Sequence, residues 1–464
     1  MDDQVDLLMR ELTRRQALKA AATGGVALMG LPGLAALLDA CTPGNSSSTT
    51  SGATNLRFFR WQSDTLNQEI AAYKTSNPNV TIAVEEVPFG QMYDKIALFA
   101  ASSDPPDIIG YDAAFTKSYA ASGILLPLDK WITADQKADM IPAVVGENSY
   151  NGKLYSPGFV DSPVLMFYNK DLTDAAGVHP PQDLASAWTW AQAKEAFQKV
   201  RKGPSSNPTV WGIASSMFGD GTPGFWLRDG QLLKSGGDPT AAPTSSAYKT
   251  FQMISSDGKT ATGYVNTPEA VSALKLYQSF YSEGLTPKIG TPNQFLMGQG
   301  AFELNTIEFI NVLSGEIGIG GGVANSPVAF KWGVTPLPYV KSPVVFASSV
   351  TIGVSAKTKH PEQAGAFLAF VSSAQQSTAD TRKHGTMPPR VSVLNAFPEY
   401  KAFPRSLFVD ALQKWGQPTP VTTGFTQYSK LLTSALHDVA LGADVQTRMD
   451  QAASQIDQAL QSAP

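Results

Sequence analysis

The sequence predicts an α/β protein with two or three lobes and a largely parallel sheet. Strand-like runs alternate with helical segments at the start of the folded chain, which is the pattern of β-α-β units. The length of 464 residues and a hydrophobic fraction of 43% allow a large core divided over more than one lobe. The later half is more helical, and no repeat with a period of roughly 20–50 residues is present, so a solenoid is not supported.

Period-two alternation predicts a strand at residues 80–87, and shorter apolar runs predict strands at residues 56–61 and 106–111. A helix is expected at residues 64–76, because apolar residues recur at helical spacing and Asn77-Pro78 is a stop signal. The other expected helices cover residues 91–101, 191–201, 226–234, 268–283, 361–372 and 426–460.

Two predicted strands end in side chains that suit a ligand. In open α/β sheets, ligands bind beyond the carboxyl ends of the strands. Trp61 and Gln62 follow the first strand, and Tyr111 and Asp112 follow the third. These four residues are therefore candidate ligand contacts.

The first 41 residues resemble an export signal. Arg14 and Arg15 form a twin-arginine motif, residues 20–38 are apolar, and residues 38–41 form a lipobox that ends at Cys41. We expect residues 1–40 to be a twin-arginine lipoprotein signal peptide, with lipid attachment at Cys41 and an extracytoplasmic, membrane-anchored location. The alternatives are an accidental match and an uncleaved transmembrane helix, for which a span needs roughly 20 apolar residues.

Residues 41–54 are small and polar and are expected to form a flexible tether with a reach of roughly 20 Å.

The net charge of −4 gives no basic excess for nucleic acid. Cys41 is the only cysteine, so an intrachain disulfide and a cysteine nucleophile are excluded. The four histidines show no metal-binding spacing, and we expect neither a metal site nor a cofactor.

Several short segments occur in an order that is similar to family 1 extracellular solute-binding proteins, the sugar-receiving subunits of ABC importers that include the maltose-binding protein. The similarity runs from about residue 55 to about residue 440. The segments that carry it are residues 106–109, 119–128, 150–157, 167–172, 176–178, 188–190, 295–302, 332–338, 359–368 and 385–390.

This resemblance implies a two-lobed periplasmic-binding-protein type II fold, with a hinge and a ligand cleft between the lobes. The N-terminal lobe would contain residues 55–159 and 342–387, and the C-terminal lobe would contain residues 160–341 and 388–464. The lobes would close on a carbohydrate and dock on the transmembrane subunits of an ABC permease. We expect a monomer without catalytic residues.

Sugars present apolar faces and polar edges, so their receptors use aromatic rings together with carboxylate, amide and guanidinium groups. Tyr111 matches an aromatic of the maltose-binding relative, although a place in the core is the alternative. Ala114 and Phe115 stand where that relative has Asp and Arg, which argues against maltodextrin. Asp112 is expected to serve the same polar end, and Trp61 either stacks on sugar or packs inward.

The remaining candidates come from later segments. Asp161 comes just after Phe159, near which the resemblance implies the first crossing of the chain between the lobes, and a surface turn beside Pro163 is the alternative. Phe225 or Trp226 is expected to form a ligand wall after a glycine-rich loop, unless Trp226 packs inward.

Asn305 matches a polar cleft position of the family. Glu308 replaces a stacking Trp of the maltose-binding relative and is either a hydrogen-bonding group or an exposed helix residue. Arg390 could grip hydroxyl pairs, a carboxylate or a phosphate, with a surface ion pair as the alternative.

The sequence therefore favours a carbohydrate-binding subunit of an importer. A receptor for glycerol phosphodiesters is the alternative ligand class, resting on Arg390. A secreted glycosidase would need two facing carboxylates, and no sequence signature pairs Asp112, Asp161 and Glu308 in that way. A lipoprotein that binds glycans for adhesion or sensing is the third possibility.

Overall fold

The computed structural model describes residues 53–62, 66–88, 91–158, 160–161, 163–214, 230–289, 293–316, 326–346 and 349–463, without the side chains of residues 160, 161 and 349. The predicted signal peptide, with Cys41, and most of the predicted tether lie outside these residues. Within them, no helix combines the length and hydropathy that a membrane crossing requires.

The first sheet has five strands in the order β2-β1-β3-β12-β6. Its first three strands are parallel, whereas β12 runs antiparallel to both of its neighbours. The strand predictions for this region are confirmed, and the alternation at residues 80–87 gave the observed bounds of β2. The strands are β1 (Thr54–Trp61), β2 (Val80–Val87), β3 (Ile108–Asp112), β6 (Val160–Asp161) and β12 (Ser349–Val354).

The second sheet has four strands in the order β10-β7-β9-β8. Here β7 runs antiparallel to both neighbours, so the expectation of a largely parallel sheet is wrong for this part of the chain. The strands β7 and β9 are separated by several helices and by β8, so they do not form a β-α-β unit and the rule that makes neighbouring strands parallel does not apply to them. The strands are β7 (Leu165–Asn169), β8 (Trp211–Ile213), β9 (Gly300–Asn305) and β10 (Trp332–Thr335).

Two short pairs complete the strands, β4 (Ser149–Tyr150) with β5 (Lys153–Leu154) and β11 (Val345–Phe346) with β13 (Gly416–Gln417). The β11–β13 pair is parallel and joins segments that are far apart in the sequence.

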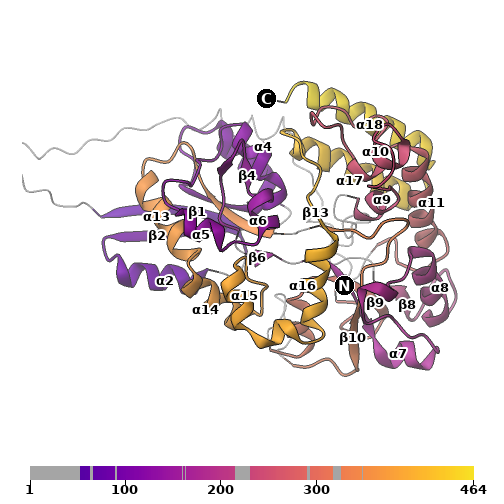
Figure 1. Ribbon diagram of the computed structural model, residues 1–464. Helices are drawn as coiled ribbons and strands as arrows, with labels where there is room; N and C mark the ends of the chain where they lie inside the picture. The colour runs from indigo at the N-terminus through magenta and orange to yellow at the C-terminus, as the bar shows by residue number, and fades with distance from the viewer. Residues whose placement is uncertain are drawn as a thin grey trace, which may run out of the picture. The chain divides into compact units, whose positions relative to one another are not determined.

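Helices α2 and α13 lie beside the first sheet (Figure 1), where Tyr73 and Phe367 pack edge to face with ring centroids 5.2 Å apart. The helices that lie between or after these strands in the sequence, up to residue 147 and from residue 361 to residue 396, are α2 (Asn67–Ser76), α3 (Met92–Ala101), α4 (Thr116–Ala121), α5 (Ala134–Ala138), α6 (Pro142–Glu147), α13 (Pro361–Val371), α14 (Ala374–His384) and α15 (Val391–Ala396). Single 3-10 turns occur at η2 (Ala113–Phe115), η3 (Leu184–Ser186) and η5 (Pro398–Lys401).

Helix α8 covers the second sheet, and α11, α17 and α18 pack together (Figure 1). The predicted helix at residues 426–460 is in fact two helices, because Gly442 adopts a left-handed φ of 112° and Asp444 caps the next helix. The helices are α7 (Lys170–Ala175), α8 (Trp190–Val200), α9 (Gln231–Ser235), α10 (Ser246–Gln252), α11 (Pro268–Ser282), α12 (Phe309–Leu313), α16 (Arg405–Trp415), α17 (Phe425–Leu441) and α18 (Val445–Gln461).

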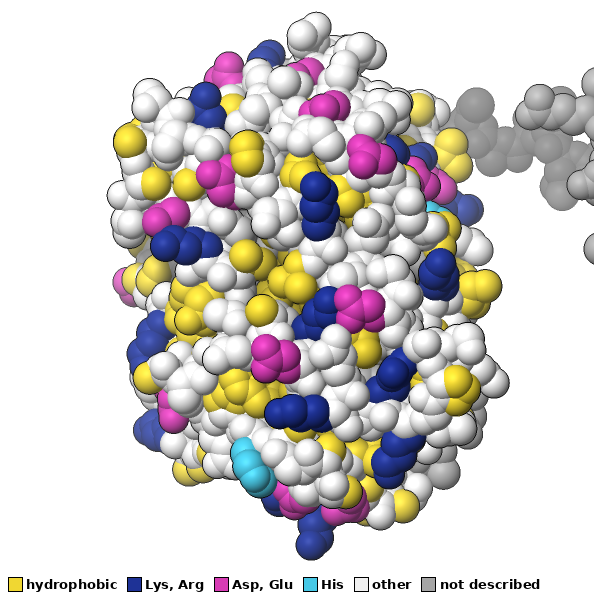
Figure 2. Space-filling model, turned by 90° about the vertical axis from the view of Figure 1, so that its right-hand side faces the viewer, with side chains coloured by type: hydrophobic (Ala, Val, Ile, Leu, Met, Phe, Trp, Pro, Cys, Tyr) yellow, Lys and Arg dark blue, Asp and Glu magenta, His cyan; other side chains and the backbone are white. Residues whose placement is uncertain are grey.

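In the described part of the chain, the buried apolar side chains form two clusters. One lies between the first sheet and helices α2 and α13, and it includes Leu56, Phe58 and Ile352. The other runs from the opposite face of the first sheet, at Phe59 and Ile109, through the second sheet to α17 and α18. On the face shown in Figure 2, acidic and basic side chains are interspersed among polar and apolar ones.

Candidate ligand-binding site

The carboxyl ends of β1 and β3 lie at one edge of the first sheet, because these strands are adjacent and parallel. The start of β12 lies at the same edge, where Val350 pairs with Asp112 on one side and with Val160 on the other. Two strand spacings separate Asp112 from Val160, which corresponds to about 10 Å. The fold therefore brings Trp61, Gln62, Asp112 and the backbone of Asp161 to one edge, although the Asp161 side chain lies outside the description.

Trp61 and Gln62 differ in exposure at the end of β1. The Trp61 side chain is half-buried and its ring lies against β3, where a Cβ atom at Gly110 would be 3.0 Å from it. The Gln62 amide N–H donates to the carbonyl of Val87 at 2.8 Å, and its side chain is exposed. A partly open ring beside an exposed amide suits a ligand with both apolar and polar surface.

Tyr111 and Asp112 point in different directions, because successive residues of a strand face opposite sides of the sheet. Tyr111 is fully buried and packs edge to face against Tyr119, and this burial raises the pKa of its phenol above the ordinary value. Asp112 is half-buried, and its Oδ1 atom accepts a hydrogen bond of 3.0 Å from the Ala114 amide. Asp112 thus fixes the turn that leads into α4.

A pocket lies directly beyond Asp112. It has room for about one water molecule and is lined by Ala113, Ala114, Lys117, Glu147 and residues 418–422. Burial lowers the pKa of the Lys117 ammonium group, and the negative charge of Glu147 opposes that shift. Glu147 itself is only 5% exposed. The pocket therefore places a cation and an anion side by side between segments that are remote in sequence.

An aromatic contact borders this pocket. Phe115 stacks on Tyr93 with ring centroids 4.5 Å apart and meets Phe425 edge to face at 5.1 Å. Phe425 is the first residue of α17, which follows residues 418–422 of the pocket wall. Phe115, which stands where the maltose-binding relative has an Arg, therefore forms an apolar contact between η2, directly after the first sheet, and α17.

Asn305 and Glu308 follow the second sheet. The Asn305 side chain is half-buried, and its Oδ1 atom accepts a hydrogen bond of 2.9 Å from the Thr306 amide. Glu308 is half-buried directly before α12, and its charge raises the pKa values of Asp380 and Tyr400. Neither residue is among those that line the pocket beyond Asp112.

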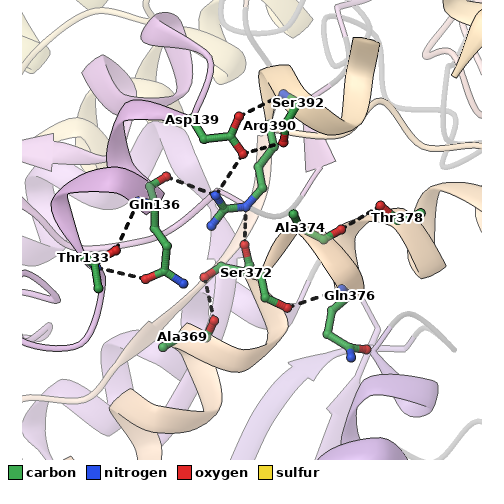
Figure 3. Close-up of polar contacts among 11 residues, drawn as sticks. Thr133, Gln136, Asp139, Ala369, Ser372, Ala374, Gln376, Thr378, Arg390 and Ser392 are labelled. Carbon is green, nitrogen blue, oxygen red and sulfur yellow. Dashed lines mark hydrogen bonds and ion pairs between the residues drawn. The ribbon is translucent and has the colours of Figure 1, made fainter. Parts of the chain in front are cut away.

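Arg390 lies away from that pocket. Its side chain is buried, its Nε atom donates to the carbonyl of Ser372, and its Nη1 atom donates to the carbonyl of Gln136 at 3.1 Å (Figure 3). The same Nη1 atom lies 3.3 Å from Asp139 Oδ2. The guanidinium group therefore joins α5 to the end of α13 and to α15.

Asp139 completes this network from α5. Its carboxylate also accepts hydrogen bonds from the Ser392 amide at 2.9 Å and from the Ser392 hydroxyl at 2.7 Å (Figure 3). Burial raises the pKa of Asp139, but these bonds and the nearby Arg390 charge outweigh it and hold the pKa below its ordinary value.

Sequence reasoning missed Lys117, Glu147 and the segment 418–422. A weak sequence signal pointed to Lys117, because it lies on the helix that follows the strand ending at Asp112. No sequence signal pointed to Glu147. Phe225 and Trp226 lie outside the described residues.

In the described part of the chain, no group of three His, Cys, Asp or Glu side chains is arranged to hold a metal ion. The edge therefore offers hydrogen bonding, charge and ring stacking.

Comparison with known proteins gives a consistent result. The family described as bacterial extracellular solute-binding protein matches residues 61–378. A putative binding protein of Brucella abortus (strain 2308) is 23% identical over 382 residues, which cover 80% of this chain and 83% of the relative. The arabinooligosaccharide-binding protein of Bacillus subtilis is 26% identical over 351 residues, which cover 71% and 72%.

Among solved structures, an ABC substrate-binding protein from Listeria monocytogenes in complex with cycloalternan has 21% sequence identity and a TM-score of 0.69. The match covers 87% of this chain and 98% of that chain. The predicted two-lobed α/β fold is thereby confirmed.

Proposed function

Because the chain belongs to the bacterial extracellular solute-binding proteins, we propose that it captures a carbohydrate between its two lobes and delivers it to an ABC permease. Two of the similar proteins support this ligand class, since one is named for arabinooligosaccharide and another was solved with cycloalternan. The role is one of binding, without catalysis.

The edge of the first sheet where β1 and β3 end and β12 begins is the observation that carries the proposal, and the small pocket beyond Asp112 lies next to it. Lys117 and Glu147 supply a donor and an acceptor of opposite charge, so the pair suits the hydroxyl groups of a neutral sugar. Trp61 would offer a half-buried ring to an apolar sugar face, and Gln62 and Asp112 would add polar contacts at the same edge. Asp161, Phe225, Trp226, Asn305 and Glu308 remain proposed contacts.

Glycerol phosphodiesters are not favoured as ligands. That alternative rested on Arg390, whose buried guanidinium group already serves carbonyl and carboxylate oxygens of the protein. Lys117 does not replace it, because Glu147 lies nearby and offsets its charge.

We also propose the bounds of the two lobes and the route by which the protein is exported and anchored. The lobes would comprise residues 55–159 with 342–387 and residues 160–341 with 388–464. Export would use the twin-arginine signal, Cys41 would carry the lipid, and residues 42–54 would let a monomeric body move above the membrane.

The first test is thermal unfolding of the chain with a panel of monosaccharides, oligosaccharides and glycerol phosphodiesters. A carbohydrate at 100 times its dissociation constant should stabilise the protein by about 2.7 kcal/mol. Lys117→Met should lose most of that gain, because it removes the charged donor from the pocket. Lys153→Met is the matched control, since Lys153 is exposed on β5. Stabilisation by phosphodiesters alone, or by no compound in the panel, would contradict the proposal.

A further inference from the structure

The end of α14 is held by side chains from three other elements. Asn311 of α12 donates from Nδ2 to the carbonyl of His384 at 3.0 Å, and Arg405 of α16 donates to Asn311 Oδ1 at 2.6 Å. Arg405 also donates to the carbonyl of Gly385 at 3.3 Å, and the Tyr400 hydroxyl of η5 donates to the carbonyls of Gly385 and Thr386. We name these three side chains, Asn311, Tyr400 and Arg405, the clasp.

The clasp connects the two sheets. Helix α14 follows α13, which packs on β12 of the first sheet. Asn311 lies on α12, which follows β9 of the second sheet, and α16 packs against β11 and η3. A movement of one sheet relative to the other would therefore strain or break these bonds.

A buried carboxyl group lies beside the clasp. Asp380 of α14 is only 3% exposed, and its Oδ2 atom accepts a hydrogen bond of 2.8 Å from the Thr386 hydroxyl. Its Oδ1 atom is buried without a hydrogen-bond partner. The Nε2 atom of His384 lies 3.8 Å from that oxygen, too far for a hydrogen bond.

Charged groups from several elements face Asp380. Glu69 approaches from α2, Glu308 from the start of α12 and Tyr400 from η5, whereas Lys383 and His384 belong to α14 itself. Arg405 of α16 lies over the Tyr400 ring, with 5.7 Å between its Cζ atom and the ring centroid. Two acidic residues, one from a helix of each sheet, thus converge on one buried carboxyl group.

This setting favours the neutral form of Asp380. Burial is the main cause that raises its pKa to about 7, and Glu69 and Glu308 raise it further, while the Thr386 hydroxyl and Lys383 act in the opposite direction. The pKa of Glu69 is also raised, chiefly by burial. A proton on Asp380 can occupy the oxygen that lacks a donor and removes the repulsion between the three carboxyl groups.

We propose that Asp380 is a proton-operated latch, which holds the clasp closed when its carboxyl group is neutral and promotes separation of the two lobes when it ionises. The inference deepens the proposed function and rests on it, because it makes capture and release of the ligand depend on the external pH. The ligand that controls the latch is the proton that binds the Asp380 carboxyl group.

The direction follows from linkage. The pKa of Asp380 in the clasped form is about 7, above the ordinary value of 3.8 that a solvated carboxyl group would regain on opening. The stabilisation of the clasped form is therefore complete below the ordinary value and is lost as the pH rises through about 7. The ratio of clasped to open molecules should fall about ten-fold between pH 6 and pH 8.

Spin-label distance measurements can test this without any ligand. In the full chain carrying Cys41→Ser, cysteines introduced by Lys74→Cys on α2 and Lys275→Cys on α11 would be the only thiols, and both positions are exposed. The short-distance population should give way to a longer one as the pH rises. Asp380→Asn keeps an acceptor for Thr386 and should stay in the short-distance population at every pH.

Two further variants sharpen the result. Glu69→Gln removes one of the repelling charges and should move the midpoint of the transition to lower pH. Asp410→Asn is the matched control, because Asp410 lies on the surface of α16 in an i,i+4 pair with Lys414, and it should leave the transition unchanged. The latch proposal would be overturned if the distance distribution did not change with pH. It would also be overturned if the Asp380→Asn protein showed the same transition. Since no sugar is present, failure of the carbohydrate proposal would leave this readout unaffected.

Discussion

Arg390 shows what a buried charge requires at the scale of one residue. Its guanidinium group is buried, and two carbonyl oxygens and one carboxylate replace part of its hydration, whereas its Nη2 atom has no hydrogen-bond partner among the described residues. Removing one member of such a set leaves the other members without their partner. The contribution of Arg390 to stability therefore depends on its three partners, and Ser392 shares one of them.

We expect Arg390→Met to lower the free energy of unfolding by about 2–4 kcal/mol, because the Gln136 and Ser372 carbonyls and the Asp139 carboxylate lose a charged donor. Arg57→Met is the control. Arg57 also bonds a carboxylate, that of Asp104 at 3.0 Å, but the two side chains are 43% and 70% exposed. Its loss should cost no more than about 1 kcal/mol. Urea unfolding of both variants measures the difference, and equal losses would contradict the assignment.

At the scale of elements, the ends of helices decide how the chain turns. Thr189 and Gln192 form a capping box at α8, and Thr133 and Gln136 form another at α5. Helix α14 ends instead at Gly385, which has a left-handed φ of 65°. The end of α14 is additionally fixed by the clasp, so its glycine is constrained by neighbours as well as by its backbone angle.

Gly177 provides a matched comparison for Gly385. Both have a φ of 65°, but a Cβ atom at Gly177 would meet nothing within 4 Å, whereas one at Gly385 would lie 2.1 Å from Asn311 Nδ2. Gly177→Ala should cost about 1–2 kcal/mol from the left-handed backbone alone. Gly385→Ala should cost more, because Asn311 must also leave the His384 carbonyl. Thermal unfolding of the two variants tests this, and identical melting temperatures would show that the clasp contributes nothing.

At the scale of the whole molecule, one core cluster passes from the first sheet to the second sheet and on to α17 and α18. Phe115 and Phe425 lie in this cluster and join η2 to α17 beside the pocket. A residue at the first sheet therefore shares its packing with a helix that comes about three hundred positions later in the chain.

A double-mutant cycle with Phe115→Leu and Phe425→Leu should give a coupling energy of about 0.5–1.5 kcal/mol, the usual strength of an edge-to-face aromatic pair. Phe115→Leu combined with Phe367→Leu is the control, because Phe367 belongs to the other core cluster. That pair should be additive to within about 0.5 kcal/mol. Unfolding free energies supply all the values. A Phe115–Phe425 coupling no larger than the control would mean that the contact does not join the two parts energetically.

Local patterns in the sequence determined a large part of the fold. The alternation at residues 80–87 gave β2, and the Asn77-Pro78 stop signal placed the end of α2. The rule that ligands bind beyond parallel strands selected Trp61, Gln62, Tyr111 and Asp112; Trp61, Gln62 and Asp112 lie at one edge, whereas the Tyr111 side chain is buried in the core. These inferences succeeded because strand period, helix period and chain direction are properties of neighbouring residues.

Only the tertiary structure decided what each side chain meets. The sequence left Arg390 as either a ligand contact or a member of a surface ion pair, but its side chain is buried and Ser372, Gln136 and Asp139 contact it from other segments. Lys117 and Glu147 become a pocket pair only because residues 418–422 fold across them. Such contacts join positions tens to hundreds of residues apart, and local periodicity carries no information about them. The sequence by itself determined the family and the edge of the sheet where a ligand is expected, whereas long-range packing decided which charges are buried, paired or open to a ligand.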